Sequence, residues 1–91
     1  MTLKIERRRS GDTLIVQLIG EFDVEYLDEV NAQVSDAQRP VVVDIGELTL
    51  ISVEGIRFLN ACRDSGMPII NASGYITEWM TLEGQSGPKR P

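Results

Sequence analysis

Hydroxyl and carboxylate side chains are the reactive groups concentrated in the middle of the chain. Ser52 and Glu54 stand at the predicted start of a helix, while Asp44 and Glu47 flank the predicted end of the strand before it. A helix start presents free backbone N–H groups and the positive end of the helix dipole, which suits anions and polar contacts with a partner. We therefore expect the function to lie at this junction.

Catalytic groups are scarce elsewhere. The chain has no histidine, so the commonest general base and the commonest neutral metal ligand are missing. Cys62, the single cysteine, falls on the apolar side of a predicted helix and suits a small core residue. No glycine-rich phosphate loop is present, and Asp44 with Glu47 could hold a hydrated magnesium ion but fit solvated side chains better. The sequence predicts no enzyme, no cofactor and no metal site, which leaves a protein that binds a macromolecule or a small ligand.

Composition and charge bound the class of protein. With 91 residues, 42% of them hydrophobic, the chain can build one modest core, and no apolar run approaches the ~18 residues that span a bilayer. We expect a single domain over residues 1–84 and a loose tail over 85–91. The amino terminus lacks the apolar segment of a signal peptide, which favours a cytoplasmic protein. A net charge of −5 disfavours binding to nucleic acid.

Apolar periodicity predicts an alternating α/β order. The expected elements are strands at 3–7, 14–20, 41–44 and 68–72, and helices at 24–38, from Ser52 to Gly66 and from Ser73 to Gly84. The first two strands form an antiparallel hairpin, and the later strands follow helices as parallel strands do. This order predicts a mixed four-stranded sheet with about three helices.

Helix ends and charge clusters refine this picture. Asp23, Ser52 and Ser73 suit N-caps, and Gly84 suits a C-cap. Four cations on the first strand could touch anionic lipid or nucleic acid, but they fit the protection of a sheet edge better. These cations are Lys4, Arg7, Arg8 and Arg9.

Four segments of the chain match, in order and spacing, those of a known domain family. They are Gly20-Glu21-Phe22-Asp23, the strand at 41–44 that ends in Asp44, residues 50–56, and residues 66–72. Together they resemble the STAS domain, which is found in anti-sigma factor antagonists and in sulfate transporters. The resemblance covers nearly the whole chain. It implies a small STAS-like α/β fold and a non-enzymatic module that docks a protein partner.

The resemblance also identifies a departure at the phosphorylation loop. In the family this loop typically reads Asp-Ser-Ser/Thr-Gly, and a partner kinase phosphorylates the hydroxyl residue before the glycine, which switches binding off. Matching Gly55 to that glycine puts Ser52, Val53 and Glu54 on the three preceding positions, so the phosphoacceptor position has no hydroxyl. A phosphoserine carries about −1.5 to −2 charge and a glutamate about −1, so Glu54 imitates the modification in part.

Two interpretations of Glu54 stay open at this stage. It fixes the junction in one charge state, or it only stabilises the helix start through the dipole. Ser52 keeps a hydroxyl, but its position favours capping over phosphorylation.

The resemblance implies a partner surface made of Asp23, Ser52, Glu54 and Arg57. The partner would be a GHKL-type kinase that also acts as an anti-sigma factor, in bacterial transcription regulation. An alternative is a regulatory subunit seated on the ATPase of an ABC transporter of the lipid-transport type, and a third is a small-ligand sensor. None of these requires insertion into a membrane, and the oligomeric state stays open.

Overall fold

The computed structural model describes residues 2–35 and 40–85. Its strands and helices, in chain order, are β1 (Leu3–Ser10), β2 (Thr13–Phe22), the 3-10 helix η1 (Val24–Tyr26), α1 (Leu27–Ser35), β3 (Val41–Ile51), α2 (Val53–Asp64), β4 (Ile69–Ile70) and α3 (Gly74–Gln85). The predicted tail at 85–91 lies outside the described residues except for Gln85, which ends α3.

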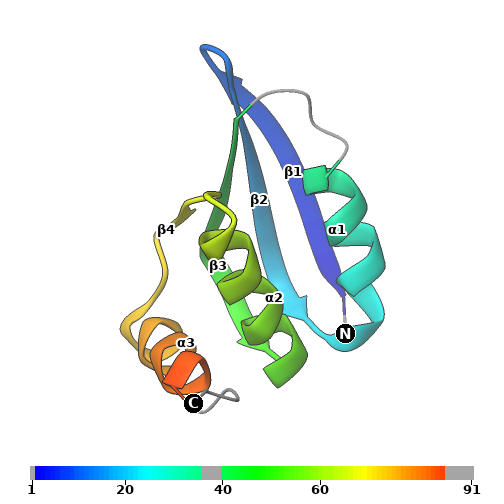
Figure 1. Ribbon diagram of the computed structural model, residues 1–91. Helices are drawn as coiled ribbons and strands as arrows, with labels where there is room; N and C mark the ends of the chain where they lie inside the picture. Colours follow the sequence, from blue (N-terminus) through cyan, green and yellow to red (C-terminus); the bar gives the residue numbers. More distant parts are fainter. Residues whose placement is uncertain (1, 36–39, 86–91) are drawn as a thin grey trace.

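The strands form one mixed sheet in the order β1-β2-β3-β4. β1 and β2 make the predicted antiparallel hairpin, with pairs from Leu3 and Gly20 to Ser10 and Thr13. β2 runs parallel to β3, and β3 runs parallel to β4. Figure 1 shows the hairpin turn at one end of the sheet and the carboxyl ends of β2 and β3 at the other. The predicted α/β fold class, a mixed four-stranded sheet with about three helices, is confirmed.

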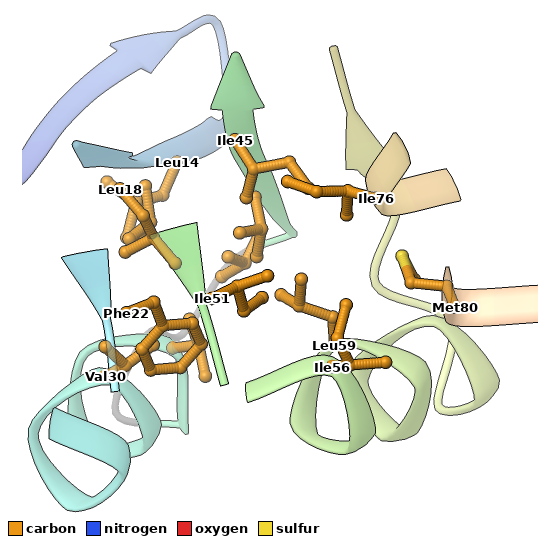
Figure 2. Packing of buried hydrophobic residues seen from close by; sticks show 14 residues of the cluster. Leu14, Leu18, Phe22, Val30, Ile45, Ile51, Ile56, Leu59, Ile76 and Met80 are labelled. Carbon is orange, nitrogen blue, oxygen red and sulfur yellow. The ribbon is translucent and has the colours of Figure 1, made fainter. Parts of the chain in front are cut away.

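One face of the sheet packs on the helices. In β2, Leu14, Val16 and Leu18 are at most 5% exposed, because alternate side chains of a strand point to the same face. In β3 the same face carries the buried Val41, Val43 and Ile45. All three α-helices contribute to this one cluster, through Val30 and Val34 in α1, Ile56 and Leu59 in α2, and Ile76 and Met80 in α3. Figure 2 shows these side chains converging between strands and helices.

β3 is longer and β4 is shorter than the sequence pattern predicts. The segment after Asp44, predicted as a loop, continues as strand because β2 pairs with it as far as Phe22 and Ile51. Two register shifts interrupt this pairing, and these irregularities hide the two-residue alternation from sequence inspection. The predicted strand at 68–72 is reduced to two residues, since Asn71 adopts a positive φ of 63° that ends the extended backbone.

The predicted N-caps Asp23 and Ser73 are confirmed, but the first turn of one helix and the last residue of another differ from the prediction. The predicted helix at 24–38 begins as the 3-10 turn η1, where the Asp23 carboxylate accepts a hydrogen bond from the Val24 N–H at 2.7 Å, and its predicted end lies outside the described residues. Ser73 caps α3 by accepting a hydrogen bond from the Ile76 N–H at 3.2 Å. Gly84 does not end α3, because the helix continues to Gln85.

Candidate functional site

The carboxyl ends of β2 and β3 meet beside the start of α2 (Figure 1). The Ser52 N–H donates a hydrogen bond of 3.0 Å to the carbonyl of Phe22, which holds the two chain segments side by side. A pocket of about 200 Å³ opens there, lined by Glu21, Phe22, Asp23, Leu50, Ile51 and Ser52. We call residues 21–23 and 50–55 the corner.

Ser52 caps α2, as the sequence predicts. Its backbone is extended, with φ of −83° and ψ of 167°, and its hydroxyl oxygen accepts a hydrogen bond from the Gly55 N–H at 3.1 Å. This bond satisfies one of the backbone N–H groups that a helix start leaves without a partner. The hydroxyl therefore has a structural task at the corner.

Gly55 allows α2 to approach the sheet closely. A Cβ atom at this position would lie 2.8 Å from Cγ1 of Ile51 and 3.1 Å from Cδ2 of Phe22. Both neighbours are buried, at 4% and 1% exposure, so neither side chain can move aside freely. The geometry of the corner thus requires glycine here.

The predicted degenerate phosphorylation loop is a helix start in the structure. Ser52 is the N-cap, and Val53, Glu54 and Gly55 belong to the first turn of α2. Glu54 is exposed in that turn and has no ion-pair partner among residues 2–35 and 40–85. A first-turn carboxylate is favoured by the helix dipole, so the geometry is compatible with both interpretations of Glu54.

The predicted partner residues divide into two groups. Asp23 and Ser52 come together in the lining of the pocket, and Glu54 follows two positions later on the exposed side of α2. Arg57 is absent from the pocket lining. It forms an ion pair with Glu83 of α3, with Nε and Oε1 2.9 Å apart, and so links two helices.

Two exposed aliphatic side chains, one in the corner and one beside it, were not predicted from the sequence. Leu50 is 54% exposed and lines the pocket, and Val24, next to Asp23, is 51% exposed. In the sequence, each of these two residues is a large aliphatic residue that lies beside polar residues and outside any predicted apolar stripe. This pattern could have indicated their exposure. Because the sequence pattern predicts a loop at Leu50, it predicts no direction for this side chain.

Burial changes the proton affinity of two side chains, Tyr26 in η1 and Cys62 in α2. Partial burial raises the pKa of the Tyr26 phenol above its ordinary value, and the adjacent Glu25 carboxylate adds to the effect. Burial also raises the pKa of the Cys62 thiol. Cys62 is 6% exposed, which confirms the predicted core position and disfavours the reactive thiolate.

Asp44 corrects the sequence-based expectation of a solvated carboxylate at a strand end. Since β3 continues to Ile51, Asp44 lies inside the strand and is only 4% exposed. Its Oδ1 accepts a hydrogen bond from the Gly46 N–H at 2.9 Å, and its Oδ2 lies 3.7 Å from Nη2 of Arg8. Glu47 is exposed, as predicted.

Within the described part of the chain, no group of three or more histidine, cysteine, aspartate or glutamate side chains gathers to hold a metal ion. In the same part, none of the helices has the length and apolar character needed to cross a membrane.

The fold resembles that of a solved anti-sigma factor antagonist. Superposition on SpoIIAA in its unphosphorylated form gives a TM-score of 0.65 at 19% sequence identity, over 91% of this chain and 81% of that one. An uncharacterised DUF3478-family protein from Shewanella loihica PV-4, described as having a SpoIIAA-like fold, gives a TM-score of 0.44 at 21% identity, over 91% and 77%. No family model and no curated protein sequence matches the chain. The comparison with SpoIIAA confirms the STAS-like fold that the sequence motifs predict.

Proposed function

We propose that this chain is a non-enzymatic protein-interaction module of the anti-sigma factor antagonist type, which docks its partner at the corner. The observation that carries the proposal is the corner itself, where the exposed Leu50 and the buried Phe22 and Ile51 line a small pocket beside a helix start. Asp23, Ser52 and Glu54 supply polar contacts there, and Arg57 lies one turn further along α2. The likeness of the fold to an anti-sigma factor antagonist supports this class of function.

The size of the pocket favours a polypeptide over a small ligand. Sites for small molecules usually enclose about 300–1,000 Å³, and this pocket of about 200 Å³ falls below that range. A pocket of this size suits one large side chain of a partner, in the manner of an interface hot spot. The buried Phe22 and Ile51 form its apolar part, and the exposed Leu50 forms its rim.

The proposed partner is a GHKL-type kinase that also acts as an anti-sigma factor, and the proposed setting is the cytoplasm. Glu54 occupies the position that matches the phosphoacceptor and cannot accept phosphate. The Ser52 hydroxyl is engaged with the Gly55 N–H, which supports a capping role. Binding is therefore constitutive with respect to phosphorylation.

Affinity capture from the native cell tests this proposal. We expect the tagged wild-type chain to retain the kinase and Leu50→Asp to lose it. Leu82→Asp serves as a matched control because Leu82 is 55% exposed on α3, outside the corner. An ABC transporter ATPase in place of the kinase would support the transporter alternative instead.

A second measurement tests the missing switch. The purified chain is incubated with the captured kinase and ATP, and its phosphate content is measured by mass spectrometry. We expect no phosphate on residues 52–55. Stoichiometric phosphorylation of Ser52 would contradict constitutive binding while leaving the docking site intact.

A further inference from the structure

The sheet has a second face that the described helices do not cover. β2, β3 and β4 run parallel, and sheets built from parallel strands are usually covered on both faces, although here β1 adds an antiparallel edge. In the described part of the chain, the side chains that alternate with the buried core of these strands form what we call the open face. Its members are Ile15, Gln17, Ile19, Val42, Asp44 and Ile70.

Aliphatic side chains dominate the open face without joining the core. Ile15 pairs in register with Val42 across β2 and β3, and Ile70 pairs with Asp44 across β3 and β4. These aliphatic residues and Ile19 are half-buried, and none belongs to the core cluster or packs against it. The row continues to the exposed Leu50, which pairs with Glu21 at the carboxyl end of β2. These aliphatic residues therefore form an apolar strip along the seam between β2 and β3, which the polar pair Gln17 and Asp44 interrupts near its middle.

Charge along this strip is unbalanced at one end. Lys4 pairs with Glu6 at 3.1 Å, and Arg8 lies 3.7 Å from Asp44, so these charges compensate each other. The remaining acidic residues, Glu21 and Glu47, lie toward the carboxyl ends of the strands.

In register, Glu47 pairs with Ile19 and Glu21 with Leu50. Neither glutamate has an ion-pair partner among the described residues. The end of the strip nearest the corner is therefore negative.

We propose that the open face binds an amphipathic helix of a partner protein, which lies along the β2–β3 seam with its N-terminal turn at Glu21 and Glu47. A helix layer on this side would give the parallel strands the second cover that they normally have. The positive end of the helix dipole, reinforced by lysine or arginine in the first turn, complements the two glutamates. A partner helix in the opposite orientation would bring the negative end of its dipole to Glu21 and Glu47, which is unfavourable.

The geometry of the strip sets the length and pattern of this helix. Six residues separate Ile15 from Glu21, which is about 20 Å of strand at ~3.3 Å per residue. A helix rises ~1.5 Å per residue, so about 13 residues span the strip. Its contacting side chains are large aliphatic residues at i, i+3 or i+4, and i+7 spacing. The strip meets the pocket at Glu21 and Leu50, whereas Ile15 and Ile19 lie outside the pocket lining, so variants at these two isoleucines test the open face apart from the proposed function.

A selection from a library of displayed random 16-residue peptides tests the inference. We expect the wild-type chain to enrich sequences with the helical aliphatic spacing and a basic first turn. A synthetic peptide made from the enriched sequence should become helical on binding. It should shift the methyl NMR signals of Ile15, Ile19 and Ile70 while leaving the core Ile56 and Ile76 unchanged.

Matched variants test whether the selected peptide binds to the open face. Ile19→Thr keeps a β-branched side chain and should weaken the selected peptide about tenfold, the loss expected when one apolar anchor is removed. Ile15→Thr provides the same test if Ile19→Thr unfolds, and Leu82→Thr is the control for an exposed aliphatic residue elsewhere.

Several outcomes would overturn the inference. Enriched peptides without the helical spacing, or with an acidic first turn, contradict it, and so does binding that survives both threonine variants. Dimerisation of the wild-type chain that depends on Ile19 would assign the open face to a second copy. Binding to anionic vesicles that depends on Ile19 would assign it to a lipid surface. Ile15 and Ile19 do not line the pocket, so kinase capture by the Ile15→Thr and Ile19→Thr variants should match the wild type, and the two proposals fail separately.

Discussion

The two faces of the sheet carry similar aliphatic side chains but differ in what covers them. Val16 and Leu18 are fully buried beneath the helices, whereas Ile15 and Ile19, one position away, stay half-buried on the open face. A strand that is apolar on both faces is typical of a parallel sheet covered twice. The difference teaches that the covered face determines the stability of this fold, while the open face and the corner are available for binding.

The largest expected effect comes from the covered face. Leu59 is fully buried in the core, so Leu59→Ala should lower the free energy of unfolding by about 2–5 kcal/mol through lost burial and a cavity. This is a large share of the ~5–15 kcal/mol that stabilises a typical domain. On the open face, Ile19→Thr should lower the free energy of unfolding by no more than about 1 kcal/mol. Urea denaturation of both variants measures the contrast, and equal losses would show that the faces are energetically equivalent.

The corner should respond to a single methyl group. Gly55→Ala puts a Cβ atom 2.8 Å from Ile51 Cγ1, and the resulting overpacking should lower the free energy of unfolding by about 1–3 kcal/mol. Gly84→Ala is the matched control, because the nearest atom to its Cβ is Nδ2 of Asn60 at 4.0 Å. In this exposed helical position alanine should raise stability by about 0.5–1 kcal/mol. Thermal unfolding of the two variants should therefore shift in opposite directions.

The open face contains the buried carboxylate of Asp44. Removing it should lower the free energy of unfolding by no more than the overpacking at Gly55 does. Asp44→Ala leaves the Gly46 N–H without its acceptor and removes the neighbour of Arg8, for an expected loss of about 1–2 kcal/mol. Asp44→Asn keeps an oxygen acceptor and should recover most of the stability. If the asparagine variant is as unstable as the alanine variant, the charge on Asp44 matters more than the hydrogen bond.

The sequence predicted the elements that depend on local patterns. Asp23, Ser52 and Ser73 were identified as caps because capping depends on residue type and position within a few residues. The buried strand at 41–44 and the core position of Cys62 followed from apolar periodicity in the same way. These local features predict the fold class before any long-range contact is considered, and the observed sheet and helices confirm it.

The features that the sequence missed depend on pairing between distant strands. β3 extends past Gly46 only because β2 lies beside it, and the register shifts break the alternation that would reveal a strand. For the same reason the sequence pattern predicts an exposed strand end at Asp44 and a loop at Leu50. The open face was also hidden, because half-buried and fully buried aliphatic residues look identical along the chain.

A smaller effect is expected from the cap of α2. Ser52→Ala removes the acceptor for the Gly55 N–H and should lower the free energy of unfolding by about 1 kcal/mol. Ser52→Asp restores an acceptor at the N-cap and should return stability to near the wild-type value. Chemical denaturation of the pair separates capping from other roles, because a hydroxyl-specific role would leave Ser52→Asp as unstable as Ser52→Ala.

The smallest change in stability should come from Glu54. Its carboxylate is exposed in the first turn of α2, so Glu54→Gln should lower the free energy of unfolding by only about 0.3–1 kcal/mol through the helix dipole. If Glu54 also fixes the charge state of the corner, affinity for the captured kinase should change several-fold in Glu54→Gln and return in Glu54→Asp. Calorimetric titration of the three proteins measures this. A stability change without any change in affinity would reduce Glu54 to a helix-stabilising residue and leave partner binding to the pocket and its apolar rim.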